Sequence, residues 1–166
     1  MIAKEINTFS KIIHRAFPHT VSALIVFVGD EYTRLDFYHL GKRGRILEIP
    51  FGTTNILNRI AERFNISPKL ASSYLVLWQT DSLDSKTKRK LEEVLTSGQA
   101  YFMNLWSQTE YFKVDSPYVV FVHVRSPFEG FFQSVLEKIS SHNKISVLGP
   151  KNELTKLLHT EYFQIL

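Results

Sequence analysis

The amino-acid sequence predicts an α/β fold, with a mixed sheet of about five strands and helices on both faces. Two nearly continuous apolar runs, Val21–Val28 and Tyr118–Val124, are typical of strands buried on both faces. Between them lie long segments with the periodicity of amphipathic helices. A glycine-containing turn at 41–44 separates two further strand-like segments, which predicts an antiparallel hairpin.

The first part of the chain is expected to contain one helix and three strands. Residues 2–17 place isoleucine and phenylalanine side chains near one helical face, and Pro18 ends that helix. The strands are expected at Val21–Val28, Tyr32–Leu40 and Arg45–Ile49, and the second of them alternates between apolar and polar residues.

Three helices are expected in the middle of the chain. The first carries apolar side chains from Ile56 to Phe64, with Thr53 or Thr54 available as its N-cap. The second begins at Ser67–Pro68, a capping residue followed by proline at the first helical position. The third is long, from about residue 85 to residue 111, and has an apolar stripe at helical spacing.

The rest of the chain alternates between strand and helix. After the strand Tyr118–Val124, a helix is expected over 127–141, a short strand over 144–148 and a last helix over 152–159. Three antiparallel strands followed by strand–helix–strand units form the pattern of an RNase H-like domain. Because no repeat, low-complexity tract or long linker interrupts the sequence, residues 1–166 are expected to form one domain.

Composition limits the possible functions. The chain has 166 residues, 44% of them hydrophobic and none of them cysteine, which excludes disorder, disulfide scaffolds, thiol catalysis and thiolate zinc sites. The six histidines show no metal-ligand spacing, so no metal site is expected. The net charge of +4 permits an anionic partner without requiring one. The longest apolar run, Ala23–Val28, is too short for a transmembrane segment, and no signal peptide is expected.

One segment could bind an anion. Gly52, Thr53 and Thr54 lie between the third strand and the next helix, and a helix that starts in this way can present free backbone N–H groups. The more frequent structure at such a position is an ordinary connection between strand and helix. Both alternatives stay open on the sequence.

The same segment carries a resemblance. Residues 49–61 read I-P-F-G-T-T-N-I-L-N-R-I-A and resemble the segment I-P-x-G-x-x-x-I-x-x-x-I-A of the bacterial actin-like ATPases, the family of the cell-division protein FtsA and the pilus-assembly protein PilM. Residues 66–71, I-S-P-K-L-A, resemble the helix that follows it in the family. Residues 28–33 stand where the family has its second phosphate loop, D-x-G-G-x-x-T. The resemblance spans the whole chain but only the second half of such an ATPase, so the half with the first phosphate loop is missing.

The departures from the family pattern affect its nucleotide site. Phe27 replaces the metal-associated aspartate, and Asp30 replaces the second glycine, where a carboxylate would repel phosphate. After the second buried strand, 125–128 reads R-S-P-F where the family has a Gly-Gly turn. We therefore expect a degenerate site that hydrolyses no ATP and needs no cofactor. Its positions are Phe27, Gly29, Asp30, Thr33, Gly52, Thr53, Arg125 and Ser126.

The resemblance implies a non-catalytic adaptor or scaffold domain in the cytoplasm, which associates with a protein partner in a complex of the cell-division or pilus-assembly type. Association with further copies of the chain stays open. One alternative is half of an ATPase assembled from two chains. Another is a helix-turn-helix-like DNA-binding regulator over 59–78, which is disfavoured because its second helix carries a single basic residue, Lys69.

Two clusters of side chains are candidates for contacts. The aromatic residues exceed what one helix face can bury, which predicts a hydrophobic association surface formed by Phe128 with Phe131 or Phe132. Basic residues gather at the start of the long helix, where positive charge is unfavourable, so a local acidic partner is conceivable. These basic residues are Lys86, Lys88, Arg89 and Lys90.

Overall fold

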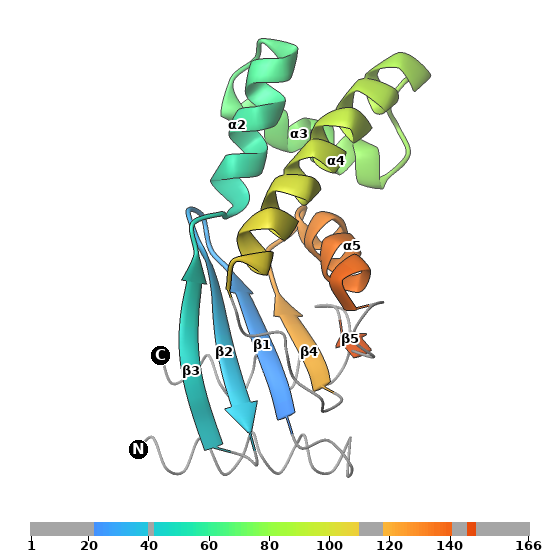
Figure 1. Cartoon of the computed structure of the whole chain (residues 1–166). Helices are drawn as coiled ribbons and strands as arrows, with labels where there is room; N and C mark the ends of the chain where they lie inside the picture. The colour runs from blue at the N-terminus through green and yellow to red at the C-terminus, as the bar shows by residue number, and fades with distance from the viewer. Residues whose placement is uncertain (1–21, 40–41, 110–117, 141–145, 149–166) are drawn as a thin grey trace.

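The computed structural model describes residues 22–39, 42–109, 118–140 and 146–148. Its centre is a mixed sheet with the strand order β3-β2-β1-β4-β5 (Figure 1). β1 pairs antiparallel with β2 and parallel with β4, while β2–β3 is an antiparallel pair and β4–β5 a parallel one. The predicted mixed α/β fold and its hairpin are therefore confirmed. The strands are β1 (Ser22–Val28), β2 (Thr33–His39), β3 (Lys42–Ile49), β4 (Tyr118–His123) and β5 (Ser146–Leu148).

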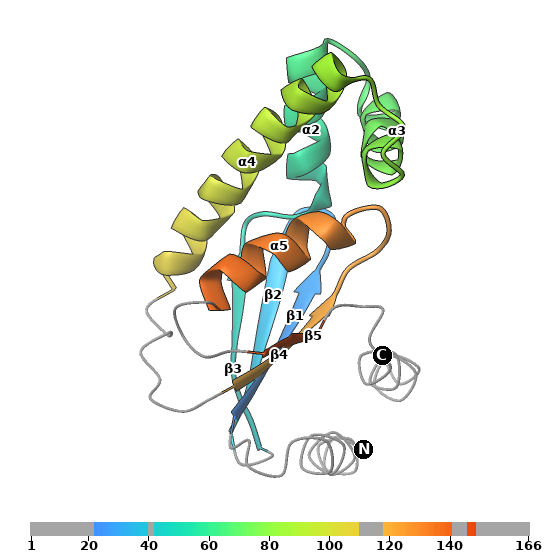
Figure 2. The ribbon, with the colours of Figure 1, turned by 90° about the vertical axis from the view of Figure 1, so that its right-hand side faces the viewer.

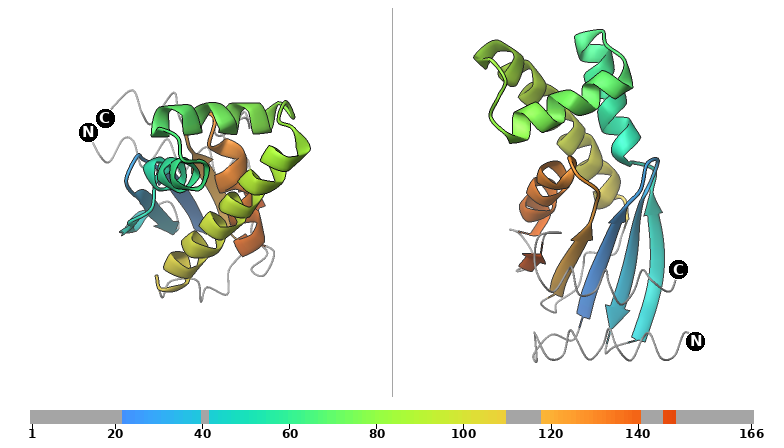
Figure 3. Two further views of the ribbon diagram at one scale, coloured as in Figure 1. Left: turned by 90° about the horizontal axis from the view of Figure 1, so that it is seen from above. Right: turned by 180° about the vertical axis from the view of Figure 1, so that it is seen from behind.

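Four helices are described, namely α2 (Thr53–Phe64), α3 (Pro68–Gln79), α4 (Ser85–Ser107) and α5 (Glu129–Ser140). α5 and the C-terminal part of α4 lie against one face of the sheet (Figure 2). α2, α3 and the start of α4 extend past the end of the strands, where they form a separate group of helices (Figure 3). The helices expected over 2–17 and 152–159 lie outside the described residues. Among the described helices, none has the length and apolarity that crossing a membrane requires.

β1 is buried on both faces, as its apolar sequence predicts. Leu24 and Val26 point into the core that the helices cover, and they are 1% and 0% exposed. Ala23 and Ile25 alternate with them, lie on the opposite face and are also buried. Because side chains on both faces of this central strand are buried, nearly every position can be apolar.

The core between the sheet and the helices is built around the aromatic ring of Phe51. Its centroid lies 5.4 Å from that of Phe102 and 6.1 Å from that of Phe131, with the second pair stacked. Phe132 meets Phe102 edge to face at 5.7 Å. Such tilted and offset pairs are the favourable arrangements of aromatic rings.

The predicted association surface at these phenylalanines is wrong. Phe128, Phe131 and Phe132 are 2%, 1% and 0% exposed, because α5 turns this side toward α4 and the sheet. The side chains of consecutive helical residues point in directions about 100° apart. Phe131 and Phe132 are nevertheless both buried, because α5 packs against both α4 and the sheet. Among the described residues, these three phenylalanines belong to the core, whereas the Tyr101 side chain is 43% exposed.

The predicted ends of several elements differ from the structure by one or more residues. The N-cap of α2 is Gly52 rather than a threonine, and the Gly52 N–H donates to Asn55 Oδ1 at 2.7 Å. β3 begins at Lys42, so the strand pairing reaches into the segment that was expected to be a turn. α4 ends at Ser107, short of the expected 111. The cap of α3 is confirmed, because Ser67 Oγ accepts from the Leu70 N–H and Pro68 occupies the first turn.

Candidate functional site

Three loops meet at one end of the sheet. They follow β1, β3 and β4, whose carboxyl ends lie at the same edge because these strands run in the same direction (Figure 1). This edge is where open α/β sheets usually bind ligands. The sequence placed its candidate nucleotide positions in these three loops, and the structure brings most of them together.

The start of α2 is closed by the turn between β1 and β2. The Thr53 N–H donates to the Gly29 carbonyl at 3.0 Å, and the Thr54 N–H donates to the Asp30 carbonyl at 2.8 Å. The Gly52 N–H is bound to Asn55, as described above. A helix start binds an anion through N–H groups that lack internal partners. These three N–H groups are therefore not available to an anion, which favours the ordinary connection between strand and helix, the more frequent of the two alternatives.

Asp30 joins the three loops through its side chain. Asp30 Oδ1 accepts a hydrogen bond from Thr53 Oγ1 at 3.0 Å and lies 2.5 Å from Arg125 Nη2. The same nitrogen of Arg125 donates to Thr53 Oγ1 at 3.3 Å. The Asp30 carboxylate is thus paired with a cation from the same chain, the Arg125 guanidinium of the loop after β4.

Backbone packing at this edge depends on Gly52. A Cβ atom at this position would lie 2.5 Å from the Asp30 carbonyl oxygen and 2.6 Å from that of Gly29. The buried Thr33 hydroxyl donates to the Phe51 carbonyl at 2.7 Å, which fixes the residue before this glycine. These contacts hold the loop after β3 directly against the turn after β1.

Two predicted positions lie apart from this group. Phe27 points to the opposite face of the sheet, where its ring centroid is 6.1 Å from that of His123 and 5.6 Å from the guanidinium carbon of Arg34. Ser126 is exposed and precedes a cis peptide bond to Pro127. Among the described residues, no group of three or more acidic or histidine side chains could hold a metal ion.

The segment considered as a helix-turn-helix is a packed pair of helices. The rings of Phe64 and Tyr74 lie 4.8 Å apart across α2 and α3. Tyr74 and Trp78 are half-buried rather than fully buried. The exposed side of α3 is mostly apolar, with Leu70 54% and Leu77 41% exposed. Because phosphate contacts dominate affinity for DNA, such a helix is poorly suited to that role.

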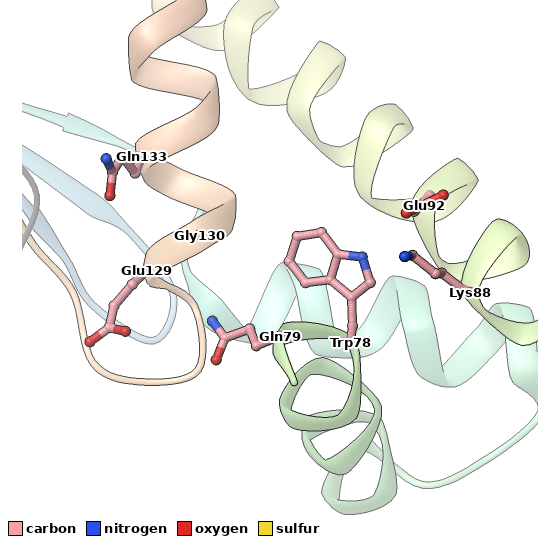
Figure 4. A pocket seen from close by; sticks show the side chains of 7 residues that line it. All are labelled: Trp78, Gln79, Lys88, Glu92, Glu129, Gly130 and Gln133. Carbon is pink, nitrogen blue, oxygen red and sulfur yellow. The ribbon is translucent and has the colours of Figure 1, made fainter. Parts of the chain in front are cut away.

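A groove between three helices was not predicted from the sequence. It has a volume of about 530 Å³ and lies between the end of α3, the first half of α4 and the start of α5 (Figure 4). Among the residues that line the groove, the sequence analysis named only Lys88, as part of the basic cluster at the start of the long helix. The acidic partner considered there is Asp81. Lys88 Nζ lies 2.6 Å from Asp81 Oδ1, and this hydrogen-bonded ion pair lowers the pKa of Asp81 and raises that of Lys88. The groove is lined by Trp78, Gln79, Lys88, Glu92, Glu129, Gly130 and Gln133.

Comparison with known proteins places the fold among the actin-like proteins. No protein-family model and no curated protein matches the sequence. Among solved structures, the chain is similar to one of a PilM–PilN type IV pilus biogenesis complex, with 14% identity and a TM-score of 0.56. That match covers 96% of this chain and 48% of the other.

Two further structures show the same similarity. An archaeal actin homolog matches at 8% identity and a TM-score of 0.59, over 96% of this chain and 55% of the other. The ethanolamine utilization protein EutJ from Carboxydothermus hydrogenoformans matches at 16% identity and a TM-score of 0.52, over 90% and 50%. The chain thus has the actin-like, RNase H-like fold and spans about half the length of these proteins.

Proposed function

We propose that this chain is a non-catalytic actin-like domain that acts by protein association, in a complex of the pilus-assembly or cell-division type in the cytoplasm. It corresponds in this proposal to the second half of an actin-like ATPase. The observation that carries the proposal is the closed start of α2, where the turn after β1 takes the Thr53 and Thr54 N–H groups.

The closed start of α2 matters because of what phosphate binding requires. A phosphate group needs free N–H donors and uncompensated positive charge. Here the donors are hydrogen-bonded within the chain, and the Asp30 carboxylate lies beside them. The nearby cation, Arg125, is already paired with Asp30. A nucleotide would have to displace these contacts and approach a carboxylate.

Association with a protein is supported by the similarity to the PilM structure. That structure contains a second protein, PilN, together with PilM. The exposed apolar side chains on α3 also favour a protein contact over a nucleic-acid contact. Neither the two-chain ATPase nor the DNA-binding regulator gains a supporting contact from the described residues, since the loop edge is closed and α3 is weakly charged.

Binding of nucleotide is the direct test. Titration with Mg-ATP and Mg-ADP should leave the melting temperature unchanged, whereas a ligand at 100 times its Kd would stabilise the fold by about 2.7 kcal/mol. The variant Asp30→Gly restores the family residue and should still bind no nucleotide, because the α2 N–H groups remain occupied. A saturable rise in melting temperature of the unaltered chain would overturn the proposal. If the proposal holds, cross-linking in the source cells should recover a component of a pilus or division complex.

A further inference from the structure

β3 forms one outer edge of the sheet, and this edge is long (Figure 1). Its eight residues, Lys42–Ile49, make it the longest of the described strands. In the described part of the chain, no strand pairs with the side of β3 that faces away from β2. Ile46 is 46% exposed, and Gly44, Arg45 and Glu48 are exposed as well. Because a strand directs alternate N–H and C=O groups to either side, this edge presents donors and acceptors to a further strand.

The other outer strand of the described sheet differs from β3. β5 has only three residues, Ser146–Leu148, and α5 packs against it. Short edge strands and covering helices are means by which proteins prevent pairing with another chain. β3 is long and carries a bulge instead, because its register to β2 shifts between Asp36 and Tyr38. From Ile46 to Ile49 the register is regular, so the second half of this edge can extend the ladder.

The sequence of β3 indicates which kind of strand fits beside it. The strand reads K-R-G-R in its first half and I-L-E-I in its second half. The first half is therefore basic, and the second half is apolar apart from Glu48. Two copies of β3 side by side would bring together an excess of positive charge, which disfavours pairing between copies of this chain. The same charge attracts an acidic strand.

We propose that the outer edge of β3 binds an extended, acidic segment of a partner polypeptide by strand addition. In this mode backbone hydrogen bonds supply affinity, and the side chains supply specificity. Antiparallel pairing is the more stable arrangement, and it places the end of the added strand beside the basic half of β3. The partner segment therefore begins with β-branched residues and ends with acidic ones. The site deepens the proposed adaptor function and rests on it, because it states how the partner is bound.

The test uses the whole chain and a defined probe, the fluorescein-labelled peptide Thr-Val-Thr-Val-Glu-Thr-Glu-Asp-amide, with fluorescence anisotropy as the signal. A neutral control peptide contains glutamine and asparagine in place of the acidic residues. A second control keeps the acidic residues and carries N-methyl groups on two consecutive central peptide nitrogens, so it loses a donor on either side. We expect saturable binding of the acidic peptide, with at least fivefold weaker binding of the neutral peptide and at least tenfold weaker binding of the N-methylated one.

Hydrogen exchange and variants locate the binding. Backbone amides of β3 should exchange more slowly when the acidic peptide is bound, whereas exchange in α3 should not change. Ile46→Thr, which keeps a β-branched residue, and Arg45→Gln should each weaken binding about two- to fivefold. Arg89→Gln on α4 makes the same change in net charge as Arg45→Gln, lies outside the edge and should have no effect. Melting curves of each variant check that the fold is retained.

Three results would overturn the strand-addition proposal. The first is equal binding of the acidic peptide and either control peptide, or no saturable binding of the acidic one. The second is unchanged exchange in β3, or a loss of affinity that Arg45→Gln and Arg89→Gln share equally. The third is dimerisation of the chain alone in sedimentation velocity that Ile46→Thr abolishes, because a second copy would then occupy the edge.

These outcomes are distinguishable from failure of the adaptor function. If strand addition fails and no nucleotide binds, the adaptor function stands with a different partner surface. Saturable ATP binding would overturn the adaptor function even if β3 binds the acidic peptide.

Discussion

The guanidinium of Arg125 lies 2.5 Å from the carboxylate of Asp30. This ion pair links the loop after β4 to the turn after β1. Both residues depart from the family pattern that the sequence resembles, and they depart in a compensating way. A carboxylate where phosphate would bind is matched by a cation where glycine would stand. The pair is supported by Thr53 Oγ1, which contacts both side chains at the start of α2.

The Asp30–Arg125 pair should contribute little to stability. Their side chains are 59% and 60% exposed, and exposed ion pairs contribute less than about 1 kcal/mol. A double-mutant cycle with Asp30→Ala and Arg125→Ala, measured by urea denaturation, should give a coupling energy in that range. A coupling well above it would show that the pair holds the loop edge together, beyond neutralising Asp30.

Gly52→Ala should destabilise the fold by about 1–3 kcal/mol, the usual cost of forcing atoms into a packed site. The added methyl group would lie 2.5 Å from the Asp30 carbonyl oxygen, so the two loops must separate. Gly130→Ala is the matched control, because its Cβ has no neighbour closer than 3.7 Å and alanine favours the helix by about 1 kcal/mol. Denaturant midpoints that fall equally for both variants would contradict this account.

Phe132→Ala should cost about 3–5 kcal/mol of stability, the range for large-to-small changes of buried phenylalanine. Phe132 is fully buried and packs edge to face on Phe102 and Phe131. Tyr101→Ala, which removes a 43% exposed ring, is the control and should cost much less. Sedimentation velocity of the folded fraction should show no change in association for Phe132→Ala. Lost association without lost stability would restore the surface role that the burial contradicts.

The Asp81–Lys88 pair should make stability depend on pH in a defined direction. The hydrogen bond and charge of Lys88 hold the pKa of Asp81 below its usual value in the folded state. Stability from this pair is therefore present above the usual aspartate pKa, near 4, and is lost as the pH falls through the lowered pKa. The raised pKa of Lys88 means a second loss as the pH rises through that value.

Asp81→Asn provides the measurement of this pH dependence. Asparagine tolerates the left-handed backbone of residue 81, where φ is 53°, so the variant removes the charge and keeps the turn. The difference in melting temperature between the two proteins should be largest near neutral pH and should shrink toward pH 2. A difference that is constant over this range would show that the ion pair contributes nothing.

The local elements of the fold were predictable because their signals lie within short segments. The apolar run that ends at Val28 is typical of a strand buried on both faces, and Ser67–Pro68 marked the start of α3. The cap of α2 was not predictable in the same way. Thr53 and Thr54 are better caps by residue type, but the close approach of the Asp30 backbone requires glycine at the position before them.

The sequence predicted which loops form the candidate site, but it did not predict the contacts between their side chains. The sequence by itself determined the order of strands and helices, and with it the edge where Gly29, Gly52 and Arg125 meet. Only the tertiary structure decided that Asp30 pairs with Arg125, that Phe131 and Phe132 are both covered, and that Trp78 borders a groove between three helices. Periodicity reports which side of a helix is apolar, whereas these contacts depend on which elements pack on that side.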